Sequence, residues 1–167
     1  SEYNHNIDRI SGVFKKEPGS SASLLASTSA GTVNGEGAVM FLLERKAAQR
    51  RQVRIREVTT LSFASPAQVE ERLSELLDRH DLEAASIDAL MLGYNGDVRS
   101  AGWYDRIRGC FGGATPVFSF KNACGEYPTA SAFAVWLGHQ LLTNQPVPAT
   151  LRCSGKMPDK PANLLIY

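Results

Sequence analysis

The fold of this chain is decided around one polar turn, Lys121-Asn122-Ala123-Cys124-Gly125-Glu126-Tyr127. A short apolar run at 116–120 precedes the turn, and a longer apolar run at 129–142 follows it. The first run has the length of a buried strand, and the second has the composition of a helix that is buried on most sides. The sequence therefore predicts a strand, a polar turn and a helix, an arrangement that commonly builds functional sites.

The same alternation continues toward the N-terminus. An apolar run at 88–94 predicts a second buried strand, and the polar residues Asn95-Gly96-Asp97 follow it directly. The stretch Ser65-Pro66-Ala67-Gln68 predicts the start of a helix that ends near His80. It combines a serine N-cap, a proline at the first helical position and a glutamine three residues after the cap.

Further elements complete the predicted pattern. A continuous apolar run predicts a buried strand at 39–43, and alternating apolar residues predict another at 54–63. A short basic helix is expected between these two strands. The remaining elements are a helix at 103–111 and closing strands at 146–152 and 162–167.

Strands that alternate with helices predict an α/β fold with a mostly parallel, mixed sheet covered by helices. Residues 1–34 are expected to form an irregular, loop-rich leading segment, and residues 35–167 the α/β domain. The carboxyl ends of parallel strands lie at one edge of a sheet, where sites are commonly built. We therefore expect Asn95 and Lys121, which follow two such strands, to converge.

Composition argues against several classes of protein. The 167 residues carry 18 basic and 17 acidic side chains, and a net charge of +1 provides no general attraction to nucleic acid. The apolar runs are shorter than the roughly 20 residues of a membrane helix, so no membrane insertion is expected. Residues 1–17 lack the apolar centre of a secretory signal. The first residue is serine, which suggests a fragment or a processed chain.

The cysteines, Cys110, Cys124 and Cys153, are odd in number and have no metal-ligand spacing. This pattern predicts reduced thiols in a cytoplasmic protein. No cluster of His, Cys, Asp and Glu has ligand spacing, and no phosphate-binding glycine loop follows a strand. We therefore expect neither a metal nor any other cofactor.

Basic residues crowd into the segment from Arg45 to Arg56. Such a cluster either forms the solvated end of a helix or docks an acidic partner such as a carrier protein. Both interpretations stay open on the sequence.

Two motifs resemble the β-ketoacyl-acyl-carrier-protein synthase family of the thiolase fold. One is Gly35-Glu36-Gly37-Ala38 with the apolar run that follows it. The other is the lysine turn, in which Lys121, Gly125 and the small residues at the start of the next helix match the family. The resemblance covers the C-terminal half of the family's catalytic unit, so it implies a thiolase-like layered fold.

Both histidine positions of that family are substituted. Asn95-Gly96-Asp97 matches the position of the family's His-Gly-Thr, so Asn95 replaces its histidine. Gly125-Glu126-Tyr127 matches the position of Gly-His-Thr, so Glu126 replaces the second histidine. Asp105 approximates a further acidic position, and the family's last glycine- and phenylalanine-rich loop has no equivalent at 153–161.

The resemblance implies site residues of two kinds. The catalytic positions are Lys121, Glu126 and Asn95, and the substrate-binding positions are Cys124, Gly125 and Asp97. Enzymes of the family transfer the acyl chain to a cysteine, which would lie outside this chain, and two imidazoles then donate hydrogen bonds to an enolate. The amide of Asn95 can donate one hydrogen bond. Ionised Glu126 cannot, and its charge opposes an enolate.

These substitutions favour a non-catalytic, chain-length-factor-like subunit that shapes an acyl pocket in fatty-acid or polyketide-type biosynthesis. Its partners would be acyl carrier protein and either a ketosynthase or a second copy of this chain. The alternative is a divergent, active acyl-transferring condensing enzyme with Glu126 as acid or base. A third hypothesis is an acyl transferase or hydrolase that uses Cys124, activated by the nearby cation of Lys121.

Some of these residues also have a purely structural interpretation. Lys121 either supports catalytic residues or forms an ion pair with Glu126 or Asp97. The tryptophans either line an acyl tunnel or belong to the core, and the histidines are expected at the surface or at helix ends. These residues are Trp103, Trp136, His5, His80 and His139. Half of a pseudo-symmetric fold leaves an apolar face uncovered, which predicts association with a partner or a second copy.

Overall fold

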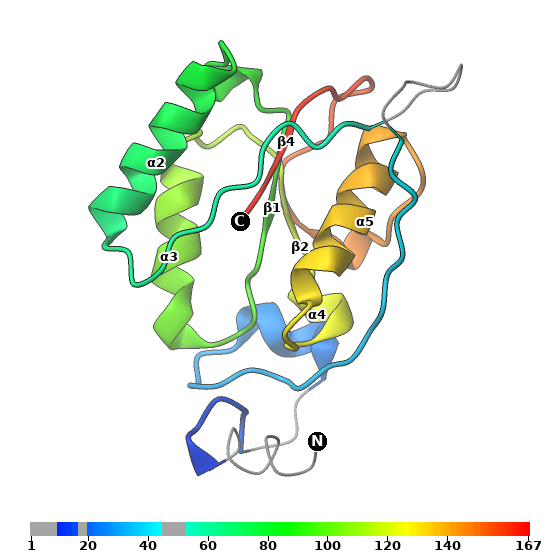
Figure 1. Ribbon diagram of the computed structural model, residues 1–167. Coiled ribbons are helices and arrows are strands. Elements are labelled where there is room, and N and C mark those ends of the chain that lie inside the picture. Colours follow the sequence, from blue (N-terminus) through cyan, green and yellow to red (C-terminus); the bar gives the residue numbers. More distant parts are fainter. Residues whose placement is uncertain (1–9, 17–19, 45–52) are drawn as a thin grey trace.

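The computed structural model describes residues 10–16, 20–44 and 53–167, and Figure 1 shows their arrangement. The α-helices are α2 (Pro66–Arg79), α3 (Val98–Gly109), α4 (Lys121–Cys124) and α5 (Ala130–Leu142). The strands are β1 (Ala89–Leu92), β2 (Val117–Ser119), β3 (Arg152–Ser154) and β4 (Leu164–Ile166). Short 3-10 helices are η1 (Ser21–Ala26), η2 (Ala84–Ser86) and η3 (Ala149–Leu151).

The four strands form one mixed sheet in the order β3-β2-β1-β4. The central strand β1 is parallel to both of its neighbours, with Leu90 opposite Val117 on one side and Leu165 on the other. Of the strands that the structure describes, only β3 runs antiparallel to its neighbour. The predicted α/β class with a mostly parallel, mixed sheet is therefore confirmed.

Helices cover both faces of this sheet. Figure 1 shows α2 and α3 on one side and α4 and α5 on the other. Leu90 and Leu92 pack into the core beside α2 and α3, whereas Ala89 and Met91 pack into the core beside α5. Because β1 is buried on both faces, its sequence is a continuous apolar run rather than an alternating one.

The helix α2 begins as its sequence predicts. The side chain of Ser65 accepts a hydrogen bond from the backbone of Gln68, and the side chain of Gln68 accepts one from the backbone of Ser65. The helix α3, by contrast, starts at Val98 rather than near residue 103. Asp97 caps it, because its side chain accepts a hydrogen bond from the backbone N–H of Arg99.

Three predicted strands are wrong. Residues 39–43 and 54–63 form no strand, and most of their large apolar side chains are exposed. Among the described residues no neighbouring strand supplies the hydrogen bonds that a strand requires. Residues 146–152 contain prolines that cannot donate to a ladder, and β3 begins only at Arg152. The closing strand predicted at 162–167 is confirmed as β4, whereas the basic helix lies largely outside the described residues.

The described part of the leading segment contains little regular secondary structure. It contains η1 and an isolated bridge between Phe14 and Thr32. Within the described ranges, no helix combines the length and the apolar character needed to cross a bilayer.

Candidate functional site

The polar turns that follow β1 and β2 meet at the edge of the sheet, as expected from the parallel order of these strands. The side-chain nitrogen Nδ2 of Asn95 donates a hydrogen bond to Oε2 of Glu126 over 2.9 Å. The ammonium nitrogen of Lys121 lies 2.8 Å from each carboxylate oxygen of the same glutamate. The three residues that the resemblance marks as catalytic therefore form one cluster, which we call the Glu126 cluster.

Lys121 and Glu126 make a partly desolvated ion pair. Their side chains are 16% and 25% exposed, so solvent screens the pair less than it screens a surface pair. The structural interpretation of Lys121 as the partner of Glu126 is confirmed. Asp97 is bound by Arg99 instead, with Nη2 2.6 Å from its carboxylate.

The amide of Asn95 is held in one orientation. Its oxygen Oδ1 accepts hydrogen bonds from the backbone of Asp97 over 3.1 Å and from the hydroxyl of Ser100 over 2.9 Å. This leaves the Nδ2 side of the amide facing Glu126. One N–H of the Asn95 amide is therefore already donated to the Glu126 carboxylate.

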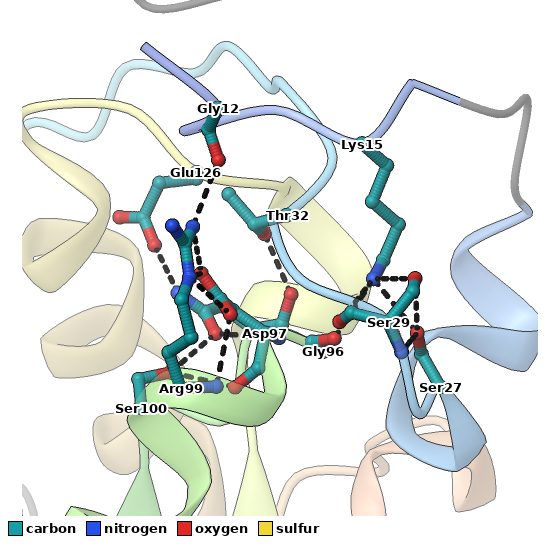
Figure 2. Close-up of polar contacts among 11 residues, drawn as sticks. Gly12, Lys15, Ser27, Ser29, Thr32, Gly96, Asp97, Arg99, Ser100 and Glu126 are labelled. Atoms are coloured by element: carbon teal, nitrogen blue, oxygen red, sulfur yellow. Dashed lines mark hydrogen bonds and ion pairs between the residues drawn. The ribbon is translucent and has the colours of Figure 1, made fainter.

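Residues of the leading segment close over the turn after β1, as Figure 2 shows. Thr32 Oγ1 donates to the backbone oxygen of Asn95 over 2.6 Å. The ammonium of Lys15 donates to the backbone oxygen of Gly96 over 2.9 Å and also to acceptors on Ser27 and Ser29. These contacts could not be predicted from the sequence, because a lysine in an irregular segment has no spacing that signals its partner.

Glycines allow residues 33–35 to pass directly behind the lysine turn. Glu126 donates its backbone N–H to Val33 and accepts from the backbone of Gly35, over 2.9 and 3.1 Å. A Cβ on Gly35 would lie 1.8 Å from the backbone oxygen of Cys124. Gly125 has φ 72°, a conformation that side chains rarely adopt, and its own Cβ would meet Gly35. Gly35 and Gly125 therefore allow close backbone packing behind the site.

Cys124 is not placed as an activated nucleophile. Burial raises the pKa of its thiol and outweighs the opposing effects of Tyr127 and of the Lys121 charge. Its Sγ contacts the backbone oxygen of Gly125 over 3.4 Å. Among the described residues, His80 pairs with Glu57 and His139 is exposed on α5, so neither imidazole is placed as a base for this thiol. Burial therefore opposes the activation by Lys121 on which the Cys124 hypothesis depends.

Asp105 and Trp103 have plain structural roles. The hydroxyl of Tyr94 donates to Asp105 over 2.7 Å, and burial, followed by this hydrogen bond, raises the pKa of the tyrosine. Trp103 packs against the core beside α2 and α3, whereas Trp136 is 41% exposed on α5.

Asp97 provides a test of the site's electrostatics. The hydrogen bonds from Arg99 hold the pKa of the Asp97 carboxyl at about 2, below its ordinary value of 3.8. A carboxyl group with a depressed pKa stabilises the fold at pH values above its ordinary pKa. This contribution is lost as the pH falls through the folded-state pKa of about 2. Asp97→Asn keeps an oxygen that can cap α3 but removes the charge. We expect this substitution to lower the free energy of unfolding by only about 1 kcal/mol at neutral pH, because solvent screens the exposed guanidinium of Arg99.

The measurement is the free energy of unfolding of both proteins from pH 7 to pH 2. The difference should shrink as the pH falls below 4, and Arg99→Met should show the same convergence with the wild type. A difference that is constant across this range would contradict the assignment.

Within the described ranges, no group of three or more His, Cys, Asp or Glu side chains is arranged to hold a metal ion. An open cavity of about 520 Å³ lies between the C-terminal end of α5 and the segment around Met157. It shares no residue with the Glu126 cluster.

Comparisons with family models, with curated proteins and with solved structures find no match to this chain.

Proposed function

We propose that this chain is a ketosynthase-like subunit of fatty-acid or polyketide-type biosynthesis that does not itself make the carbon–carbon bond. The observation that carries the proposal is the closed Glu126 cluster. Its carboxylate is bound by the ammonium of Lys121 through both oxygens and by the amide of Asn95. The side chains at the family's catalytic positions thus satisfy one another.

The condensation reaction makes a demand that this cluster does not meet. A malonyl thioester loses carbon dioxide, the resulting carbanion attacks the acyl thioester, and the cysteine thiolate leaves. The enolate that develops on the malonyl thioester needs hydrogen-bond donors directed at its oxygen. A carboxylate at one of these positions repels the enolate, and the Asn95 amide is turned toward that carboxylate.

The alternative function is a divergent condensing enzyme in which Glu126 acts as acid or base. Such a group must be within reach of the substrate and have an acceptor site free for the proton. Here Oε1 accepts from Lys121, and Oε2 accepts from both Lys121 and Asn95, so three of the roughly four acceptor sites of the carboxylate are already used within the protein. The geometry therefore favours the non-catalytic function.

Acyl carrier protein and an active ketosynthase, or a second copy of this chain, are the partners of this proposal. The thiolase-like arrangement of the complete unit is part of the same proposal. Because the described cavity beside α5 lies away from the Glu126 cluster, the acyl pocket would be completed by the partner rather than by this chain alone.

The test uses the purified chain with acyl and malonyl thioesters of acyl carrier protein, with and without an active ketosynthase. We expect no condensation product from the chain alone. In the reconstituted complex, Glu126→Gln should leave the rate within about twofold of wild type, well under 1 kcal/mol of barrier. The distribution of product lengths should respond to the presence of the chain. A condensation rate of the complex that falls by orders of magnitude in Glu126→Gln would establish the alternative instead, because the nucleophilic cysteine of that alternative lies outside this chain.

A further inference from the structure

The chain contains the dipeptide Asn-Gly twice, as Asn95-Gly96 in the turn after β1 and as Asn34-Gly35 where the leading segment ends. In such a dipeptide the backbone nitrogen of the glycine can attack the side-chain carbonyl carbon of the asparagine, because glycine has no Cβ to block the approach. The two dipeptides are chemically the same. A difference in their reactivity must therefore come from the fold.

The side chain of Asn95 is folded back over the peptide bond that leads to Gly96. Its Oδ1 accepts a hydrogen bond from the backbone N–H of Asp97 over 3.1 Å, so the ring that this bond closes contains both Cγ of Asn95 and the nitrogen of Gly96. The hydroxyl of Ser100 donates to the same oxygen over 2.9 Å, and Figure 2 shows Gly96, Asp97 and Ser100 together at this turn. Two donors on this oxygen stabilise the negative charge that develops there when a nucleophile adds to the carbonyl.

The backbone nitrogens of the two glycines differ in their hydrogen bonds. Within the described ranges, no acceptor is bonded to the N–H of Gly96. Asn95 and Gly96 are half-buried, so water and hydroxide reach this turn. Gly35, in contrast, donates its N–H to the backbone oxygen of Glu126 over 3.1 Å. The nucleophile is therefore available at Gly96 and engaged at Gly35.

We propose that Asn95 is a modification site at which the chain itself forms a succinimide. The nitrogen of Gly96 bonds to Cγ of Asn95, the Cγ–Nδ2 bond breaks, and ammonia leaves with the proton that the glycine nitrogen loses. Water then opens the imide at either of its two carbonyl groups, which gives aspartate or isoaspartate at position 95. Water is the only co-reactant. This inference uses no acyl chemistry and is independent of the proposed function.

The modification changes one side of the Asn95 side chain. In the aspartate product, one oxygen still accepts from Asp97 and Ser100, but the Nδ2 donor that faces Glu126 becomes an oxygen. Two carboxylates at hydrogen-bond distance repel each other, and the ammonium of Lys121 balances only one of them. The reaction therefore opens the Glu126 cluster.

The experiment incubates the full folded chain at pH 8 and 37 °C and follows both asparagines by peptide mass spectrometry. Conversion adds about 1 Da, and isoaspartate is identified separately from aspartate. Asn95 should convert at least about tenfold faster than Asn34 in the folded chain. In strong denaturant the two rates should agree within about twofold, because the fold no longer distinguishes the dipeptides.

Ser100→Ala tests the contribution of the hydroxyl, and circular dichroism checks that this variant is folded. It should convert Asn95 several-fold more slowly than the wild type and leave the rate at Asn34 unchanged. Equal rates at the two asparagines of the folded wild type would overturn the proposal, as would a folded chain in which neither converts. Aspartate without isoaspartate would indicate direct hydrolysis and would overturn it too, as would a wild-type rate at Asn95 in Ser100→Ala.

Discussion

Gly35→Ala is expected to lower the free energy of unfolding by about 3 kcal/mol, the upper range for overpacking. The added methyl carbon would lie 1.8 Å from the backbone oxygen of Cys124 and 2.6 Å from Cα of Gly125. Both contacts are with backbone, which cannot rotate away as a flexible side chain does. Relief requires separating residues 33–35 from the lysine turn, with loss of the hydrogen bonds that Gly35 and Val33 form with Glu126.

Chemical denaturation measures this effect, and Gly102→Ala is its control. Gly102 lies inside α3, and a Cβ there would meet no atom within 4 Å. Alanine is the better helix former, so this variant should be more stable than wild type by roughly 0.5–1 kcal/mol. If Gly35→Ala unfolded at the same denaturant concentration as wild type, the close approach behind the site would be refuted.

The second large effect is expected at the Lys121–Glu126 pair. Lys121→Met leaves the Glu126 carboxylate partly desolvated without its ammonium, which should cost about 2 kcal/mol. Glu126→Gln in the same background should recover part of this loss, because it removes the unpaired charge. A double-mutant cycle over the four proteins should yield a coupling energy of about 1–2 kcal/mol.

An exposed ion pair of similar geometry serves as the control for this cycle. Arg106 and Glu70 link α3 to α2 over 2.9 Å, and their side chains are 50% and 39% exposed. Their coupling energy, from Arg106→Met and Glu70→Gln, should stay below about 0.5 kcal/mol because solvent screens the pair. Equal coupling energies for the two pairs would show that the Glu126 cluster is no more desolvated than the surface.

Much of the fold could be predicted because its signals are local. The capping box at Ser65 and Gln68 uses contacts within one turn, so its residues alone indicate the start of α2. The continuous apolar runs of β1 and β2 have the composition of strands covered on both faces. The meeting of Asn95 with the lysine turn also followed from the sequence, because parallel strands end at one edge of a sheet.

The strand predicted at 39–43 shows where such local evidence ends. Its composition is that of a buried strand, as in β1, but a strand forms only when a neighbour supplies hydrogen bonds and apolar cover. Among the described residues β1 has neighbours on both sides, and residues 39–43 have none. Composition states what a segment can bury, and the arrangement of the whole chain decides whether it is buried.

By itself, the sequence determined the α/β class, the order of its central strands and helices, and the edge of the sheet where polar turns meet. Only the tertiary structure decided that Glu126 binds Lys121 and Asn95. It likewise decided that Asp97 pairs with Arg99 and that Lys15 of the leading segment donates a hydrogen bond to Gly96. The reason is physical. Periodicity and capping depend on neighbours within a few residues, whereas each ion pair and long-range hydrogen bond depends on which acceptor the folded backbone brings within about 3 Å.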